Sequence, residues 1–435
     1  MSNYKNQKSI LAKLGITVLN PMQKDAHQVI QNNSEVVLLS PTGTGKTLAF
    51  LLPLIAELNP DIDEVQALIV VPSRELAIQI EQVIRDMGTG YKTNAVYGGR
   101  SGSKDRIELK HRPAILIGTP GRLSDHFYRE EFDTNHIKTL VLDEFDKSLE
   151  IGFETEMIDI LSSLTALKKK VLTSATFGVK IPKFVKLQNP QEVDYLSEEG
   201  PRLNIFKIEA SDKNKLKTLV KTLNHIGNQP GIIFCNFKDS IAEVGDFLIR
   251  NNIAHTEFHG GMEQIDRERA LIKFRNGTYQ LLLATDLAAR GIDIPEITFI
   301  IHYQLPHKEE EFTHRNGRTG RMKKEGNAYV LYHESERLPD FIEQFPNKTF
   351  EDSKGWQETA WSTLYITGGR KDKISKGDIA GLLIKQGNLN KDELGVIELK
   401  QDCAFVSVCR DKMQEVINLT NNTRLKKKKV RISEI

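Results

Sequence analysis

Short apolar runs recur along the chain, and longer amphipathic stretches separate them. The runs are rich in β-branched residues and do not alternate with polar ones, which is typical of strands buried on both faces of a parallel sheet. In the first half, strands are expected at Glu35–Ser40, Ala67–Val71, Ala114–Gly118, Thr139–Leu142 and Val171–Thr173. They predict an α/β domain whose helices cover both faces of its sheet.

The same rhythm returns in the second half of the chain. Strands are expected at Gly231–Cys235, Ala254–Phe258, Gln280–Thr285, Phe299–His302 and Ala328–Tyr332, with helices such as Asp239–Asn251 and Glu263–Arg275 between them. Between the two halves, Glu198-Glu199-Gly200-Pro201 interrupts any regular element. We therefore expect two tandem parallel-sheet domains, over residues 1–195 and 196–345.

A third unit follows a polar stretch that contains Pro346 and Gly355 and that we expect to be a linker over residues 346–361. Over residues 362–435 the pattern predicts a strand, a helix, two strands, a helix and a strand. These segments are Leu364–Thr367, Lys376–Gln386, Gly395–Leu399, Ala404–Cys409, Lys412–Asn421 and Lys428–Ile432. This βαββαβ order is a split βαβ arrangement, which RNA-recognition domains share with many others.

Composition points to a globular protein of two or three domains. The 435 residues are 39% hydrophobic and 27% charged. No apolar run approaches the ~20 residues that span a bilayer, and residues 1–14 contain no apolar signal core. The sparse cysteines, Cys235, Cys403 and Cys409, have no metal-type spacing, which fits a reduced compartment. We therefore expect a cytoplasmic protein.

Charge is unevenly distributed along the chain. Residues 361–435 contain 15 basic and 9 acidic residues, a net +6, within a chain whose total is +2. The residues before them therefore carry a net −4. A basic module attached to a slightly acidic body suggests an appendage that binds a polyanion, although a solvated tail explains the charge equally well.

A glycine-rich segment, Ser40–Thr47, lies where a strand meets a helix. Gly43 and Gly45 allow backbone N–H groups to approach phosphate oxygens, and the helix N-terminus favours negative charge. Lys46 supplies charge to the β and γ phosphates, and Thr47 offers a hydroxyl to Mg²⁺. The segment predicts a nucleoside triphosphate site, although Ser40 stands where the general phosphate-loop pattern has glycine.

An acidic run, Asp143-Glu144-Phe145-Asp146, follows the apolar Leu140–Leu142. Acidic residues at the carboxyl end of a parallel strand point into the ligand crevice of such sheets. Asp143 would hold Mg²⁺ through water, and Glu144 would orient the attacking water. Alone, the run is equally well a helix-capping cluster. Together with the phosphate-binding loop, it predicts hydrolysis of the nucleotide.

Gln23 precedes the loop and gives a hint of base recognition. A glutamine amide can donate and accept at the N6/N7 edge of adenine, a match that guanine does not offer. By itself, Gln23 is an ordinary residue for a helix start. Beside a triphosphate loop, it favours ATP.

A second phosphate-handling segment, His314–Arg321, lies far along the chain. Arg318 and Arg321 are three residues apart, which puts both guanidinium groups on one face of a helix. An arginine delivered to a γ phosphate accelerates transfer by ~10³–10⁵ in known cases. The alternative is a basic surface helix. If these arginines reach the ATP, the site is composite and assembles only when two distant segments meet.

Further turns that follow strands suit the backbone of a nucleic acid. They are Pro72–Ala77, the pair Gly98-Gly99, and Thr119–Arg122. Each combines an exposed backbone turn with a helix N-terminus or an arginine, which contacts phosphodiesters without reading bases. Singly, each is more often a plain turn.

Taken in order, these motifs resemble those of the DEAD-box RNA helicases, from about Leu14 to Tyr332. The resemblance adds Ser174-Ala175-Thr176, the segment Ile232–Asn236, the pair Gln264 and Arg267, and Ala284–Asp293. It implies two RecA-like domains that close on ATP and one RNA strand. One departure is Phe145, where the family has alanine, so the larger ring must repack beside the phosphate loop or beside Ser174–Thr176.

The resemblance also assigns roles to individual residues. It implies ATP contacts for Gln23, Thr42, Gly43, Thr44, Gly45, Lys46, Thr47, Asp293, Arg318 and Arg321. Catalytic roles fall to Lys46, Glu144, His314, Arg318 and Arg321, and Mg²⁺ to Thr47 and Asp143. RNA contacts fall to Pro72, Arg74, Gly98, Gly99, Thr119, Arg122, Arg267 and Thr285. Asp146, Ser174 and Thr176 would couple the two sites.

The C-terminal unit resembles the RNA-binding domain of DbpA-type helicases, through Thr363–Arg370, Lys376–Ile379 and Lys426–Ile432. In that subgroup the domain recruits the motor to ribosomal RNA of the large subunit. Tyr365 and Phe405 are candidates for base stacking, with core packing as the alternative.

We therefore expect a monomeric, RNA-stimulated ATP hydrolase that unwinds or remodels short RNA duplexes, in assembly of the large ribosomal subunit. One alternative is a general RNA-remodelling helicase of cold response or decay. Another is an ATP-gated RNA clamp or scaffold with little unwinding. The motif set disfavours a DNA helicase.

Overall fold

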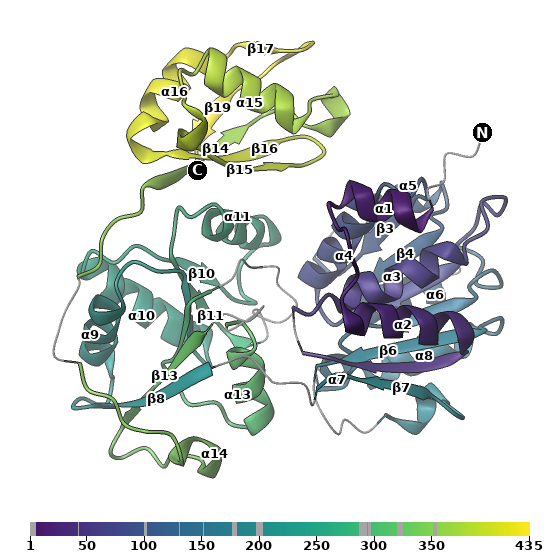
Figure 1. The fold of residues 1–435 in the computed structure, drawn as a ribbon, viewed down its shortest axis with the longest axis horizontal. Coiled ribbons are helices and arrows are strands. Elements are labelled where there is room, and N and C mark those ends of the chain that lie inside the picture. Colours follow the sequence, from purple (N-terminus) through teal and green to yellow (C-terminus); the bar gives the residue numbers. More distant parts are fainter. Residues whose placement is uncertain are drawn as a thin grey trace. The chain divides into compact units, whose positions relative to one another are not determined.

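A computed structural model describes residues 6–41, 43–99, 102–129, 131–150, 152–175, 181–196, 203–286, 294, 297–319, 325–350 and 355–435. These residues fall into two compact units, one before and one after residue 200 (Figure 1). None of the helices in this part of the chain combines the length and the apolar character that crossing a membrane requires.

The first unit is built around one parallel sheet of seven strands, in the order β3-β4-β2-β5-β6-β1-β7. The strands are β1 (Glu35–Leu39), β2 (Ala67–Val70), β3 (Thr93–Val96), β4 (Ile115–Gly118), β5 (Thr139–Leu142), β6 (Lys169–Ser174) and β7 (Gln191–Asp194). The sequence did not predict β3 and β7. Both are edge strands with polar residues, because an edge is less completely buried than the centre of a sheet.

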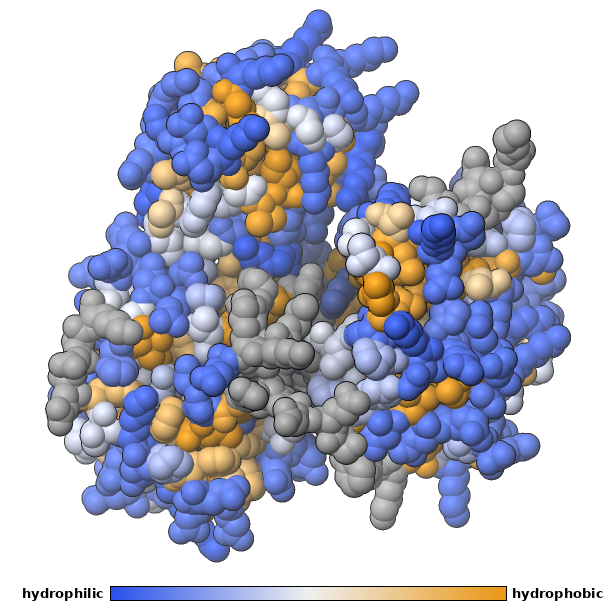
Figure 2. Space-filling model, viewed as in Figure 1, coloured by the Kyte–Doolittle hydropathy of each residue, from blue (hydrophilic) through white to orange (hydrophobic). Residues whose placement is uncertain are grey.

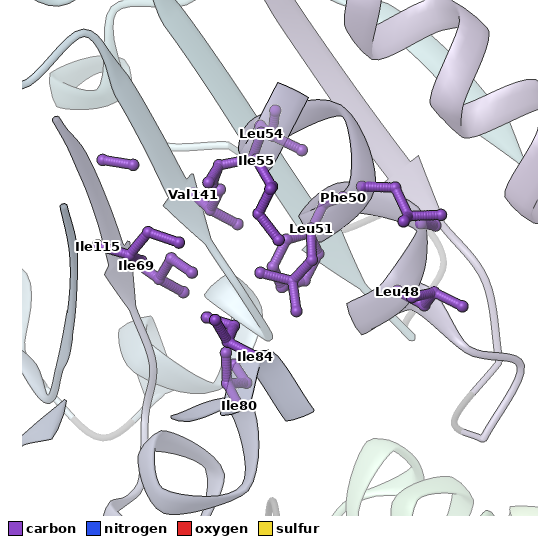
Figure 3. Packing of buried hydrophobic residues seen from close by; sticks show 14 of the residues in the cluster. Leu48, Phe50, Leu51, Leu54, Ile55, Ile69, Ile80, Ile84, Ile115 and Val141 are labelled. Atoms are coloured by element: carbon purple, nitrogen blue, oxygen red, sulfur yellow. The ribbon is translucent and has the colours of Figure 1, made fainter. Parts of the chain in front are cut away.

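Helices cover both faces of this sheet, as the non-alternating strands predict. They are α1 (Gln7–Lys13), α2 (Pro21–Asn32), α3 (Lys46–Ala56), α4 (Arg74–Met87), α5 (Gly102–Leu109), α6 (Pro120–Tyr128), α7 (Phe145–Glu150) and α8 (Glu154–Ser163). One core cluster joins α2, α3 and α4 to the sheet, and a second joins α6 and α8 to it. Figure 3 shows the first cluster, in which Leu51 and Ile55 of α3 face Ile69 and Val141.

The second unit begins with another parallel sheet, of six strands in the order β10-β11-β9-β12-β13-β8. The strands are β8 (Leu203–Ala210), β9 (Gly231–Phe234), β10 (Thr256–Phe258), β11 (Leu281–Ala284), β12 (Phe299–His302) and β13 (Gly326–His333). Its helices are α9 (Leu216–Ile226), α10 (Lys238–Arg250), α11 (Gln264–Arg275), α13 (Glu309–Asn316) and α14 (Asp340–Glu343). The sequence did not predict β8, which is again an edge strand.

A smaller antiparallel sheet, in the order β15-β16-β14-β19, forms the C-terminal domain. Its elements are β14 (Trp361–Ile366), α15 (Lys376–Lys385), β15 (Leu394–Leu399), β16 (Ala404–Cys409), α16 (Met413–Thr420) and β19 (Ile432–Glu434). The two helices pack on one face of the sheet around a core of their own. The predicted α/β class, with two parallel-sheet domains and a small βαββαβ domain, is confirmed.

One predicted strand of this domain is wrong. Residues Lys428–Ile432 were expected to form the last strand of the sheet. Instead, β17 (Arg424–Leu425) and β18 (Lys428–Lys429) form a separate hairpin, and β19 (Ile432–Glu434) pairs with β14. The run of four lysines is too polar for a buried strand and too tightly turned to continue one, because Lys426 has φ +54°.

Candidate functional site

Three neighbouring strands of the first sheet end at residues that the sequence predicts to bind or hydrolyse a nucleotide. The order β5-β6-β1 puts the acidic run, Ser174 and the phosphate-binding loop side by side at the carboxyl edge of the sheet. In open α/β sheets, ligands bind outside this edge. The fold therefore unites segments that lie more than a hundred residues apart in the sequence.

The loop after β1 has the geometry of a phosphate cradle. Gly43 and Gly45 adopt φ +85° and +90°, a left-handed region that favours glycine. The ammonium of Lys46 donates hydrogen bonds to the carbonyl oxygens of Ser40, at 2.5 Å, and Pro41, at 3.0 Å. Lys46 is buried and begins α3, whose N-terminus favours an anion. Thr44 donates to the Pro41 carbonyl at 2.8 Å, and Thr42 lies outside the described residues.

Gln23 is tied directly to this loop. Its Nε2 donates to the carbonyl oxygen of Gly45 at 3.3 Å, and its Oε1 accepts from the Asn20 amide at 3.1 Å. Asn20 in turn donates to the Thr44 carbonyl at 2.9 Å. A Cβ on Gly45 would collide with the Gln23 amide, so this position requires glycine for space as well as for backbone angle. Gln23 is thus fixed to the phosphate-binding loop by hydrogen bonds.

The acidic residues at the end of β5 are bridged by a threonine that sequence reasoning missed. The Thr173 hydroxyl donates to Oδ1 of Asp143 and accepts from the Glu144 amide at 3.3 Å. Burial, and then the charge of Glu144, raise the pKa of Asp143 to about 6, against the opposing effects of Thr173 and Lys46. Asp143 is 3% exposed, whereas Glu144 is half-buried. No motif pattern points to Thr173, because its role depends on the β5–β6 register.

The rest of the acidic run packs into the domain. Asp146 is buried and pairs with the ammonium of Lys147 at 3.2 Å. The Phe145 ring belongs to the core cluster that joins α6 and α8 to the sheet. Ser174 is fully buried, and its carbonyl accepts from the Ser40 amide at 3.1 Å, which links the end of β6 to the phosphate loop. Thr176 lies outside the described residues.

Several predicted RNA contacts meet at the neighbouring strand ends. Pro72 is buried after β2, and Arg74 begins α4. A Cβ on Gly99 would lie only 2.5 Å from Nη1 of Arg74, and one on Gly98 would lie 3.8 Å from Nη2. The guanidinium therefore lies against the backbone of the glycine pair, and Gly99 has φ +83°. Three of the predicted contacts, Arg74, Gly98 and Gly99, thus form one partly exposed corner.

Arg122 is held by a buried carboxylate. Its Nε and Nη2 both lie 2.8 Å from Oδ2 of Asp105, which is fully buried. His126 lies between Asp105, at 3.4 Å, and Glu131, at 2.6 Å. Thr119 is buried directly before α6, and its carbonyl accepts from the Arg122 amide at 3.1 Å. No motif in the sequence marks Asp105, which lies on α5, before β4.

In the second unit, Arg315 is the centre of the arginine segment. It donates to both oxygens of Asp286, at 2.6 and 2.5 Å, to the Gln304 carbonyl at 2.9 Å and to Asn236 Oδ1 at 2.8 Å. It is 1% exposed and lies over the Phe234 ring. The side chain therefore joins the ends of β9, β11 and β12 to α13. No role is predicted for Arg315 from the sequence, because its partners Asp286, Gln304 and Asn236 come together only in the fold.

The other predicted residues of this unit lie around that centre. Arg318 is buried directly after α13, and His314 is half-buried on it. Thr285 is half-buried at the end of β11, and Arg267 of α11 lies with its guanidinium carbon 4.8 Å from the Phe258 ring centre. Asp293 and Arg321 lie outside the described residues. The predicted ATP residues are thus divided between the two units.

The fold and the site together define a class. One domain contains a phosphate-binding loop and an acidic pair at the same edge of its sheet. The second parallel-sheet domain contributes an arginine segment. These are the parts of an enzyme that hydrolyses a nucleoside triphosphate and couples the hydrolysis to the binding of a second ligand.

Comparisons with known proteins agree. The family model of the DEAD/DEAH box helicases matches residues 20–184, that of the helicase conserved C-terminal domain matches 214–323, and that of the DbpA RNA binding domain matches 363–434. The ATP-dependent RNA helicase DbpA of Bacillus subtilis is 31% identical over 100% of this chain and 99% of its own length. The DbpA of Escherichia coli is 31% identical over 92% and 90%.

Solved structures show the same relationship. Dbp5 of S. cerevisiae, bound to RNA and ADP BeF3, matches with a TM-score of 0.68 and 25% identity over 76% of this chain and 88% of that one. Mss116p bound to ssRNA and AMP-PNP matches with a TM-score of 0.67, 25% identity, and coverage of 76% and 73%. The chain belongs to the DEAD-box ATP-dependent RNA helicases, a family that hydrolyses ATP, and within it to the DbpA-type helicases.

Proposed function

We propose that this helicase uses ATP and Mg²⁺ to separate or remodel short RNA duplexes during assembly of the large ribosomal subunit. The observation that carries the proposal is the C-terminal domain, which matches the DbpA RNA binding domain over residues 363–434. The resemblance to the DbpA-type subgroup implies that this domain directs the motor to ribosomal RNA. The net charge of +6 over residues 361–435 suits such a polyanion.

The ATP site is proposed at the carboxyl edge of the first sheet. Backbone N–H groups of Gly43, Thr44 and Gly45 would surround the phosphates, with Lys46 opposite the β and γ phosphates. Gln23 would contact adenine. Its bonds to Asn20 and Gly45 connect that contact to the loop. Thr42 and Asp293 are proposed to complete the nucleotide contacts.

The residues present fit a magnesium ion. Mg²⁺ prefers oxygen ligands, which the Thr47 hydroxyl and the Asp143 carboxylate supply. Burial and the charge of Glu144 raise the pKa of Asp143 to about 6, and a cation beside it would offset both effects. When bound, the ion would neutralise charge on the phosphates. The Thr173 hydroxyl, which donates to Asp143, would help to orient the carboxylate that holds the ion.

Hydrolysis is assigned to residues of both domains. Glu144 would orient and polarise the attacking water, which suits a half-buried carboxylate whose backbone is fixed by Thr173. Arg318 and Arg321, with His314 beside them, would stabilise the charge that develops on the γ phosphate. Because these groups belong to a different domain, hydrolysis would follow domain closure.

RNA would be held by its backbone. The corner of Arg74, Gly98 and Gly99 offers a guanidinium beside a partly exposed backbone, and Arg122 and Thr119 are proposed to extend it. Pro72 is proposed to shape this corner, and Arg267 and Thr285 to contribute from the second domain. Asp146, Ser174 and Thr176 would transmit the state of the phosphate loop to it. Such contacts do not depend on sequence, so specificity would come from the C-terminal domain.

Strand displacement tests this function. The full chain and ATP are incubated with a short RNA duplex that carries a labelled strand. Release of that strand by the wild type, and its loss in Glu144→Gln with ATP binding retained, are expected. ATP-dependent retention of RNA without release would favour a clamp or scaffold. Release that is equally fast with ribosomal and unrelated RNA would favour a general remodelling helicase.

A further inference from the structure

The C-terminal domain presents two chemically different surfaces. One is the helix-free face of its sheet, opposite α15 and α16. The other is a basic surface formed by residues 371–378 and the β17–β18 hairpin with its flanks, residues 424–431. Residues 371–378 carry three lysines and two aspartates, and residues 424–431 carry six basic residues and no acidic one. The end of the domain that carries β17 is hydrophilic in Figure 2.

The face of the sheet opposite α15 and α16 is covered by the preceding helicase domain. Cross-strand partners lie on the same face of a sheet, and the register pairs Thr363 with Ser407, and Phe405 with both Tyr365 and Glu398. Their chain neighbours Leu364 and Val406 face the helices in the core. The face that carries Thr363, Ser407 and Glu398 is therefore the face opposite the helices.

Specific bonds join this face to the end of α11 and the turn that follows it. Arg275 donates to both carboxylate oxygens of Glu398, at 2.7 and 2.8 Å. The Thr278 and Thr363 hydroxyls lie 2.7 Å apart, and the Ser407 hydroxyl donates to the Asn276 carbonyl at 2.8 Å. We name this the α11 junction.

The α11 junction is buried and charge-matched. Thr363 and Ser407 are 0% and 2% exposed. Burial alone would raise the pKa of Glu398, but Arg275 and Lys400 hold it below its ordinary value. Phe405 is 7% exposed, and its ring lies 5.4 Å from that of Tyr365. The aromatic pair that the sequence offers for base stacking therefore lies on an occupied face, and Phe405 has no face free for a base.

Ion pairs and hydrogen bonds hold the β17–β18 hairpin in place. Lys426 bonds to Oδ2 of Asp378 at 2.7 Å and to the Lys373 carbonyl at 2.8 Å, and Lys428 bonds to Asp372 at 2.9 Å. These bonds fix the hairpin to the turn before α15. They also leave the neighbouring Lys427 and Lys429 exposed.

Backbone angles add an independent observation. Lys426 and Lys373 adopt φ +54° and +60°, a region in which lysine is uncommon and glycine or asparagine is favoured. Both are on the basic surface and bonded to each other. The two turns of the basic surface therefore have a defined backbone conformation, and a hydrogen bond joins them.

We propose that the C-terminal domain binds the RNA phosphate backbone through the basic surface of residues 371–378 and 424–431, while the helix-free face of its sheet serves to dock it on the second helicase domain. The proposal rests on the RNA-binding function proposed above. RNA captured on the hairpin then moves with the second helicase domain, since the α11 junction joins the two.

A double variant of the hairpin tests the proposal. Lys427→Ser with Lys429→Ser is made in the full chain, and Lys385→Ser with Lys391→Ser is the matched control, because both of these lysines are exposed on the same domain outside the basic surface. Binding of short labelled ribosomal-RNA fragments is measured with ADP present, across about 50 to 200 mM salt. We expect the hairpin variant to lose roughly tenfold in affinity and its log–log salt slope to fall by about 1.5–2, with the control unchanged.

Two further variants decide between the faces. Arg275→Ala loosens the α11 junction and Tyr365→Ala removes the accessible aromatic. Both should leave RNA affinity unchanged, with folding of each checked by its unfolding midpoint. Higher affinity in Arg275→Ala, or lower affinity in Tyr365→Ala with the hairpin variant at the wild-type value, would assign RNA to the sheet face and overturn the proposal.

A truncation before residue 362 distinguishes failure of the proposed RNA-binding surface from failure of the RNA-binding function of the whole domain. If the truncated chain loses its affinity for the fragments and the hairpin variant does not, only the assignment of the surface fails. If the wild type and the truncated chain bind alike, the RNA-binding role of the domain fails, and the proposed surface fails with it.

Discussion

Arg315 binds Asp286 through two parallel hydrogen bonds, of 2.6 and 2.5 Å, at the centre of the second helicase domain. The arginine is 1% exposed, and the side chain of Asp286 is 23% exposed. The pair connects the segment that carries Arg318 to the strand end that carries Thr285. Its geometry makes Arg315 a support for the residues proposed to contact ATP and RNA.

Removing the arginine should therefore destabilise this domain strongly. Arg315→Ala leaves Asp286 without its bidentate partner, and a loss of about 3–5 kcal/mol in the free energy of unfolding is expected. Urea denaturation measures it. In a double-mutant cycle, Asp286→Asn should recover part of the loss. Strict additivity of the two substitutions would mean that the bonds contribute nothing to stability.

A buried histidine makes the stability of the same domain depend on pH. Burial, and then the charge of Arg315, lower the pKa of His302 to about 3, and its Nε2 lies 2.9 Å from Oδ1 of Asn316. In the unfolded chain, His302 takes up a proton as the pH falls through about 6.5, whereas in the folded chain it stays neutral down to about pH 3. The free energy of unfolding therefore decreases as the pH falls below about 6.5.

Between about pH 7 and pH 5, the loss should reach roughly 2 kcal/mol for His302 alone. Urea titrations of the wild type and of His302→Gln, at both pH values, measure it. The variant should show a pH-dependent loss that is smaller by that amount. An equal loss in the two proteins would show that His302 does not remain neutral in the fold.

Thr173 is expected to matter for turnover rather than for folding. Thr173→Val keeps the shape of the side chain but removes the bonds to Asp143 and to the Glu144 amide. Partners of this kind typically change activity by about 10–100-fold. The maximal ATPase rate should fall by that factor, with Thr173→Ser close to wild type. A Thr173→Val variant with the wild-type ATPase rate would show that the Thr173 hydroxyl has no role in turnover.

Arg318 tests the composite nature of the ATP site. Arg318→Ala should lower the RNA-stimulated ATPase rate by roughly 10³-fold or more and change ATP affinity little, because the arginine acts on the charge that develops during transfer. Steady-state kinetics with saturating RNA and nucleotide titration separate the two quantities. A loss confined to ATP affinity would place Arg318 in ground-state binding instead.

Local patterns predict the centres of the sheets and the phosphate loop, and the reasons are physical. Central strands are buried on both faces, so runs such as Leu140–Leu142 are unmistakable, whereas the edge strands β3, β7 and β8 carry polar residues that hide them. The loop of Gly43, Gly45 and Lys46 needs particular residues at fixed spacing, so its conformation can be predicted from the sequence.

Residues that act through a distant neighbour escape such patterns. Thr173 meets Asp143 only through the pairing of β5 with β6, and Asp105 meets Arg122 only after β4 is placed. The α11 junction joins Arg275 to Glu398, which lie 123 positions apart. Nothing local marks these residues, because an ordinary charged or hydroxyl side chain gains its role from the fold.

The most direct measurement is ATP hydrolysis by the full chain with ribosomal-RNA fragments and with length-matched random RNA, each titrated to saturation. An ATP-dependent RNA helicase directed to ribosomal RNA by residues 362–435 should reach half-maximal stimulation at a much lower concentration of the ribosomal fragments. Truncation before residue 362 should remove that difference and leave stimulation by random RNA. Equal stimulation by both RNAs in the full chain would contradict the role in ribosome assembly.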